Sequence, residues 1–151
     1  MLYWIFDLDY TLYQMKNKFS YAELKTDYLL NDMLSRLPCK RIIFTNAVLS
    51  HTKLCLHHIG ITNKFDNIIH RDIIYDLKPN LTAFKKMMLL TGIKLTDKCI
   101  FFEDNLSNLI AAKRFGWITV YINRKIINHP SVDYSFSNIY VALQYFLSVI
   151  R

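Results

Sequence analysis

LYWIFDLDYTL, residues 2–12, joins an apolar run to two closely spaced aspartates. Its first five residues show no alternation of polar and apolar side chains, which is typical of a strand buried on both faces of a parallel sheet. The run ends directly at Asp7, and Asp9 and Thr11 follow within the next four residues. Ligands bind at the carboxyl ends of strands in open parallel sheets. This stretch therefore predicts a buried first strand that delivers carboxylates to a site.

Four more apolar runs of strand length follow: RIIFT (41–45), NIIH (67–70), CIFF (99–102) and WITVYI (117–122). Helical spacing of apolar residues predicts helices at 21–37, 48–59, 79–90, 105–115 and 137–149. Three of these helices are followed by a glycine, as is common at helix C-caps: Gly60, Gly92 and Gly116. The pattern predicts an α/β fold, a doubly wound, Rossmann-like parallel sheet of about five strands with helices on both faces. The stretch 123–135 is expected to be the least regular.

Length and composition favour one globular domain over residues 1–151, because 52% of the 151 residues are hydrophobic. The three cysteines form no CxxC pair, and the five histidines show no ligand spacing, so neither a disulfide framework nor a zinc site is predicted. We expect a soluble, cytoplasmic protein without a membrane span, because the apolar runs are far shorter than the ~20 residues that a span needs. The aromatic residues near the C-terminus predict core packing, with a homodimer surface as the alternative.

The net charge of +7 favours anionic ligands such as phosphate esters and nucleotides. Nucleic acid is a partner that this charge allows but does not indicate, because the basic residues are scattered and form no dense block. We therefore expect a phosphorylated substrate, small or macromolecular.

Polar residues stand after four of the predicted strands: Asp7, Asp9 and Thr11; Thr45 and Asn46; Lys78; and Glu103, Asp104, Asn105 and Asn108. Each group alone has an ordinary structural interpretation, as a turn, a helix cap or a solvated lysine. Their joint placement at strand ends is what those interpretations leave unexplained. We therefore predict that the four groups face one crevice.

The chemistry of this set follows from charge. Carboxylates held close together repel one another and need a cation, and hard oxygen ligands suit Mg²⁺. Asp7 and Asp104 are the natural ligands, with Glu103 supporting them. Lys78 would neutralise the nucleophile and the incoming phosphate, while Thr45 and Asn46 would hold the remaining phosphate oxygens.

Two carboxylates two residues apart can divide the work of phosphate-ester hydrolysis. Asp7 can attack phosphorus and form an aspartyl-phosphate. Asp9 can protonate the leaving alcohol and later activate water. The pair therefore predicts covalent catalysis with acid/base assistance.

The ordered set resembles the four motifs of the haloacid dehalogenase-like (HAD) phosphatase superfamily, from Met1 to about Ile122. These are Asp7-Leu8-Asp9-Tyr10-Thr11, Thr45 after IIF, Lys78 in DLKPN, and Glu103-Asp104 with Asn108. The resemblance implies that Asp7 is the nucleophile and Asp9 the general acid/base. It also implies that Asp7, Asp104 and the backbone carbonyl of Asp9 hold Mg²⁺. The carboxylate of Asp9 implies a phosphatase, since pumps carry Thr there and dehalogenases lack the carboxylate. The chain departs from the superfamily motifs at two positions. Glu103 stands where Asp is commoner, and Tyr10 stands where Gly or Asn is frequent.

The spacing between the motifs leaves no room for the cap domain that many superfamily members carry, so a HAD-like fold with no cap domain is predicted. The chain is similar to small magnesium-dependent phosphatases, which act on protein tyrosine phosphate and sugar phosphates, and KFDNII…LKPN…AFKKMM looks like nucleotidase-type members. We expect an open-site phosphatase acting on phosphoprotein, nucleic-acid ends or a broad range of esters. The alternative is a small-molecule phosphatase, for nucleotides or sugar phosphates, that an oligomer partner closes. A catalytically idle binding protein is the least favoured.

Overall fold

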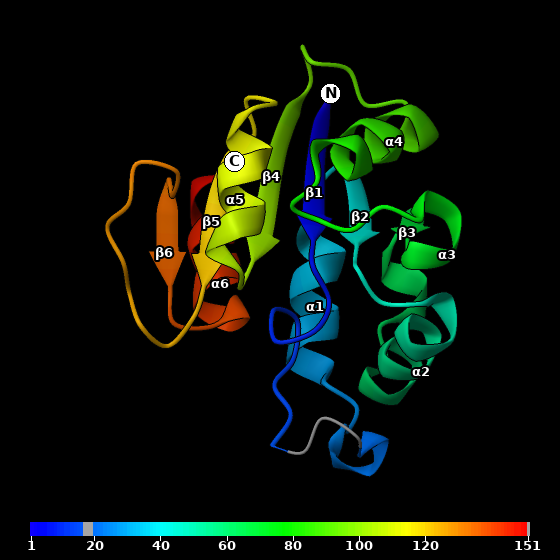
Figure 1. The fold of residues 1–151 in the computed structure, drawn as a ribbon. Coiled ribbons are helices and arrows are strands. Elements are labelled where there is room, and N and C mark those ends of the chain that lie inside the picture. The colour runs from blue at the N-terminus through cyan, green and yellow to red at the C-terminus, as the bar shows by residue number, and fades with distance from the viewer. Residues whose placement is uncertain (17–19, 151) are drawn as a thin grey trace.

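A parallel sheet forms the centre of the protein in a computed structural model that describes residues 1–16 and 20–150. Within that range the sheet has six strands in the order β3-β2-β1-β4-β5-β6, and every neighbouring pair is parallel (Figure 1). The strands are β1 (Leu2–Phe6), β2 (Lys40–Phe44), β3 (Asn67–Ile69), β4 (Lys98–Glu103), β5 (Ile118–Ile122) and β6 (Tyr134–Phe136). The chain runs outward from β1 to β3 and returns to β4 beside β1, so the strand order reverses at the β1–β4 pair. This reversal is the place where ligands bind in open α/β sheets.

Helices cover both faces of this sheet, as the sequence predicts (Figure 1). They are α1 (Tyr28–Arg36), α2 (Leu49–Ile59), α3 (Arg71–Ile74), α4 (Leu81–Thr91), α5 (Leu106–Lys113) and α6 (Ile139–Val149), with 3-10 turns η1 (Tyr21–Glu23) and η2 (Thr62–Lys64). None of the helices in the described part of the chain has the length and apolar character needed to span a membrane.

Two apolar cores flank the sheet, because successive side chains of a strand point to opposite faces. Trp4 and Phe6 of β1 pack with residues of α1, α2 and α6. Tyr3 and Ile5 of the same strand pack with residues of α3, α4 and α5. Both faces of β1 are thus covered, and the polar residues that follow it are held at a fixed edge.

The structure differs from the sequence predictions at four places. The helix expected at 21–37 is interrupted, because Leu24 is extended and Asp27 begins α1 as an N-cap that accepts a hydrogen bond from Leu30 N at 2.9 Å. Residues 71–74, which no predicted element covers, form the single turn α3. A sixth, three-residue strand, β6 (Tyr134–Phe136), begins in the last two residues of the stretch 123–135 that was expected to be the least regular. Two of the three glycine caps are confirmed, since Gly60 (φ 80°) and Gly92 (φ 76°) end α2 and α4 in the left-handed conformation. The third is not, because α5 has Arg114 as its C-cap, two residues before Gly116.

Candidate active site

Lys78 lies at the centre of the polar residues at the strand ends. Its ammonium nitrogen donates to Asp7 Oδ1 at 3.1 Å, to Glu103 Oε2 at 2.9 Å and to the carbonyl of Phe44 at 2.7 Å. Its side chain is only 1% exposed, and the nitrogen lies over the rings of Phe44 and Phe101. Lys78 is therefore a buried charge with acidic partners and not a solvated surface lysine.

The charges of this cluster depend on one another. Burial favours a neutral Asp7, but the Lys78 ammonium and hydrogen bonds from its neighbours hold the pKa of Asp7 below its ordinary value. Burial likewise opposes the charge of Lys78, yet Asp7 and Glu103 raise the pKa of Lys78. Burial raises the pKa of Glu103 well above its ordinary value, and Lys78 opposes that rise. At neutral pH the cluster therefore keeps an ionised Asp7 beside a positive charge.

A third carboxylate, Asp104, completes an acidic group beside Asp7. Thr11 Oγ1 lies 3.0 Å from Asp7 Oδ2 and 3.4 Å from Asp104 Oδ1, so its hydroxyl links the two carboxylates. Asp7, Glu103 and Asp104 each offer an oxygen, and these oxygens lie within 4.8 Å of one another. Burial raises the pKa of Asp104 to about 6, and the charge of Asp7 acts in the same direction. Crowded oxygen ligands of this kind fit a hard divalent cation such as Mg²⁺.

Asn46 and Thr45, predicted to bind phosphate, both make contacts within the protein. Asn46 Oδ1 accepts from Lys78 N at 2.8 Å, and Asn46 Nδ2 donates to Lys78 O at 3.0 Å. The amide thus holds the backbone of Lys78 from both sides. Thr45 is buried, and its hydroxyl oxygen accepts from Ala47 N at 3.0 Å. The structure therefore gives Asn46 a positioning contact that the sequence did not indicate.

The two asparagines after Asp104 differ in their surroundings. Asn105 is the N-cap of α5 and accepts a hydrogen bond from Ser107 N at 2.9 Å, as the capping interpretation expects. Asn108 lies in the first turn of α5 and is buried, and within residues 1–16 and 20–150 its Oδ1 has no hydrogen-bond partner. Because a buried polar atom without a partner costs free energy, Asn108 is the one of the pair with capacity for a further contact.

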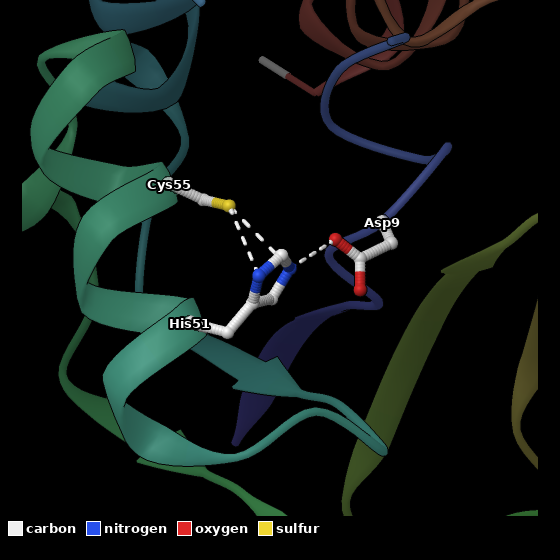
Figure 2. Close-up of side chains that lie close together, drawn as sticks. All are labelled: Asp9, His51 and Cys55. Carbon is white, nitrogen blue, oxygen red and sulfur yellow. Dashed lines mark hydrogen bonds and ion pairs between the residues drawn. The ribbon is translucent and has the colours of Figure 1, made fainter. Parts of the chain in front are cut away.

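The Asp9 side chain reaches toward α2, where it meets His51 (Figure 2). Its Oδ1 lies 2.7 Å from His51 Nε2 and accepts a hydrogen bond from the Tyr13 hydroxyl. Tyr21 OH lies 2.7 Å from His51 Nδ1, and Cys55 Sγ lies 3.5 Å from His51 Nε2. Burial raises the pKa of the Cys55 thiol. No function was predicted for His51 or Cys55 from the sequence, where the one indication that they act together is their spacing of four residues, about one helical turn.

Two hollows adjoin the aspartates. One, of about 430 Å³, lies beside Asp104 and is also lined by Asn123 and Arg124. The other, of about 200 Å³, lies beside Asp9 and His51. Tyr10 lines both hollows and has a left-handed backbone (φ 61°), a conformation that glycine and asparagine adopt more easily than tyrosine. The hollows provide room for ligand groups on either side of Tyr10.

The fold and the site define an α/β protein with a doubly wound parallel sheet that carries a carboxylate-centred site, including a buried lysine, at its strand ends. The family model for haloacid dehalogenase-like hydrolases matches residues 27–116, more than half of the chain, and the chain belongs to that family.

Solved structures share this fold. One similar structure is L-2-haloacid dehalogenase from Xanthobacter autotrophicus with chloropropionic acid covalently bound (TM-score 0.69, 17% identity, 86% of this chain and 64% of that chain). Another is a HAD phosphatase from Thermococcus onnurineus (TM-score 0.63, 23% identity, 80% and 57%). A third is an uncharacterized protein from Listeria monocytogenes serotype 4b (TM-score 0.65, 18% identity, 99% and 100%). The chain thus spans less than two thirds of the dehalogenase and the phosphatase, but the full length of the Listeria protein.

Proposed function

We propose that this hydrolase is a magnesium-dependent phosphomonoester hydrolase that works through an aspartyl-phosphate on Asp7. The observation that carries the proposal is the pairing of a buried, ionised Asp7 with Lys78, while a second carboxylate, Asp9, follows two residues later. A nucleophile must be ionised to attack, and a phosphate dianion approaches it only where positive charge offsets the repulsion. Lys78 meets both needs at one point.

The donor set fits Mg²⁺. Asp7 and Asp104 would hold the ion with the backbone carbonyl of Asp9, and Glu103 would support them. When bound, the ion would neutralise the crowded carboxylates and polarise the phosphate oxygens.

The protein residues would then act in two steps. In the first, a carboxylate oxygen of Asp7 bonds to phosphorus, the bond from phosphorus to the ester oxygen breaks, and protonated Asp9 gives its proton to the leaving alcohol. In the second, the Asp9 carboxylate takes a proton from water, and the water oxygen attacks phosphorus. The bond to Asp7 then breaks, and inorganic phosphate leaves. The Thr45 hydroxyl would hold a phosphate oxygen during both steps.

Asp9 also favours ester hydrolysis over dehalogenation. An alcohol leaves poorly unless it receives a proton, whereas a halide leaves as a stable anion and needs none. The Asp9 carboxylate, which follows the nucleophile by two residues and is held by His51 and Tyr13, is useful to the first reaction only.

The site is open in the described residues. Between β1 and β2 they hold η1 and α1, and α1 packs into the core of the sheet. Between β3 and α4 they hold the single turn α3. An open site accepts large phosphate esters, and the hollow beside Asp104 and Arg124 is a place for the leaving group. We therefore favour broad-range or macromolecular substrates over a small molecule that needs a partner subunit for closure.

The test is hydrolysis of an aryl phosphate by purified protein with Mg²⁺. We expect turnover that EDTA removes, Mg²⁺ restores and Asp7→Asn abolishes. A parallel assay for halide release from 2-chloropropionate serves as the competing reaction. Halide release without phosphate release would refute the proposal, as would full turnover by the Asp7→Asn variant. Comparing a phosphopeptide, a 5′-phosphorylated oligonucleotide and nucleoside monophosphates would then rank the substrate classes.

A further inference from the structure

Three side chains with different ligand atoms meet beside the loop that follows β1 (Figure 2). His51 and Cys55 lie one turn apart on α2 and point to the same side, because residues i and i+4 share a helix face. Asp9 reaches them from the loop after β1. One carboxylate oxygen, one ring nitrogen and one sulfur of the three lie within 4.8 Å of one another.

We propose that Asp9, His51 and Cys55 form a second metal site, which takes Zn²⁺ or a similar borderline ion, and that an ion bound there inhibits the enzyme. A nitrogen, a sulfur and one carboxylate oxygen suit zinc, whereas Mg²⁺ prefers an all-oxygen set such as Asp7, Glu103 and Asp104. The protein therefore holds two neighbouring sites of opposite chemical preference.

The distances are close to those of a tetrahedral zinc site. Zinc–sulfur and zinc–nitrogen bonds of about 2.3 and 2.0 Å place sulfur and nitrogen roughly 3.5 Å apart, and Cys55 Sγ lies 3.5 Å from His51 Nε2. Asp9 Oδ1 lies 2.7 Å from the same nitrogen, in a hydrogen bond that an ion would replace. That separation would widen by roughly 0.6 Å, which a side chain that is 36% exposed can accommodate.

The groups around the cluster support ligation. The Tyr21 hydroxyl lies 2.7 Å from His51 Nδ1, so the second ring nitrogen has the partner that zinc-bound histidines usually have. The Tyr13 hydroxyl oxygen lies 3.1 Å from Cys55 Sγ and 3.5 Å from His51 Nε2, so it borders the three ligands, and water would take the fourth position on the ion. The hollow of about 200 Å³ lined by Asp9, Tyr13 and His51 gives an ion its way in.

Charge and protons balance at this site. His51 would bind through the Nε2 lone pair and donate its Nδ1 proton to the Tyr21 oxygen. Asp9 contributes one negative charge, and Cys55 contributes a second after its thiol proton passes to solvent. One ion with two positive charges therefore gives a neutral site and releases one proton from the thiol.

Inhibition follows because Asp9 cannot transfer protons while its carboxylate binds an ion. This part rests on the proposed phosphatase function, whereas ion binding does not. A direct binding measurement therefore separates the two.

The binding test uses Co²⁺ as a spectroscopic substitute for Zn²⁺, because a cobalt–thiolate bond gives a near-ultraviolet charge-transfer band. The starting protein carries Cys39→Ser, which removes an exposed thiol that does not belong to the cluster. We expect the band to saturate at one equivalent of Co²⁺ and to disappear when Zn²⁺ is added. Adding Cys55→Ser should abolish the band, and His51→Ala, a variant that leaves the buried thiol intact, should weaken Co²⁺ binding on the order of a hundredfold. Circular dichroism would establish that both variants are folded.

The activity test adds Zn²⁺ at a fixed, saturating concentration of Mg²⁺. Cys55→Ser should keep the activity seen with Mg²⁺ alone and should raise the Zn²⁺ concentration for half-inhibition on the order of a hundredfold. A missing band at one equivalent, or an unchanged band in the Cys55→Ser variant, would overturn the metal site. Equal zinc inhibition of both proteins would show that zinc acts at the magnesium ligands, and would overturn the inhibitory role. If no phosphatase activity exists, the cobalt band still decides the site.

Discussion

Replacing Lys78 by Met removes the charge at the centre of the site and keeps most of the side-chain volume against the rings of Phe44 and Phe101. At the 3.1 Å between Lys78 Nζ and Asp7 Oδ1, the attraction between two unit charges is roughly 5 kcal/mol for an effective dielectric constant of ~20. Negative charge on the transferring phosphoryl group would gain energy of the same order from Lys78. A loss of about 4 kcal/mol of this transition-state stabilisation corresponds to about a thousandfold in kcat/KM.

The same variant should also unfold more easily, by about 3–5 kcal/mol, because removing one partner of a buried ion pair leaves the other charge unpaired. In the wild-type protein the Lys78 ammonium lowers the pKa of Asp7 against the effect of burial. Without Lys78, burial raises this pKa, so Asp7 ionises only at higher pH. Residual activity should therefore rise with pH where the wild-type protein is already ionised.

The assays are aryl phosphate hydrolysis from pH 5 to 9 and urea unfolding at neutral pH. Lys78→Arg is the control that keeps the charge with a different shape. Wild-type kcat/KM in Lys78→Met at neutral pH, or an unchanged pH profile, would refute the electrostatic role assigned to Lys78.

Three further predictions concern single side chains. Asp9→Asn should lower kcat/KM, which reports formation of the aspartyl-phosphate, by about 10²–10⁴-fold for an alkyl phosphate and much less for 4-nitrophenyl phosphate, because nitrophenolate leaves without a proton. Equal losses of kcat/KM for the two esters would contradict this. Asn46→Ala should reduce kcat/KM about tenfold, because it removes the two hydrogen bonds that hold the backbone of Lys78. A circular dichroism melt should show that this variant is folded. Unchanged kinetics would show that these hydrogen bonds do not position Lys78. Burial opposes the charge of Asp133, but hydrogen bonds from Lys113 and Thr119 outweigh it and lower the pKa of this carboxyl in the folded protein. The ionised carboxylate therefore stabilises the fold at pH values above the pKa that Asp133 has in the unfolded chain. This contribution is lost as the pH falls through the lower pKa of the folded state. Asp133→Asn should thus cost about 1 kcal/mol at neutral pH and almost nothing in strong acid, measured by urea unfolding; a pH-independent difference would argue against the ionised state.

Much of the fold could be predicted because β1, β2, β4 and β5 are continuous apolar runs and end at polar residues. β6 could not, since its three residues are only half-buried and carry no strand pattern of their own. The break before α1 depends on Asp27 capping the helix, and apolar spacing extends across Asp27 without a sign of it.

The candidate site divides in the same way. Asp7, Lys78, Glu103 and Asp104 were predicted to meet, since the carboxyl ends of parallel strands share one edge, and the structure brings them together. The contact of Asp9 with His51 could not be predicted, because it depends on how α2 lies beside the loop after β1. The hydrogen bonds of Asn46 to the backbone of Lys78 likewise join segments 32 positions apart.

The ammonium of Lys78 bonds to the last residue of β2, to the residue after β1 and to the last residue of β4. One side chain therefore links three adjacent strands, and the same side chain is part of the proposed catalytic machinery. A descendant of this protein that abandoned catalysis could not discard Lys78 alone, because Asp7 and Glu103 would remain as buried, unmatched acids. We expect inactive relatives to replace Lys78, Asp7 and Glu103 together with apolar or neutral residues. Loss of activity would then be visible in their sequences as simultaneous substitutions at these three positions.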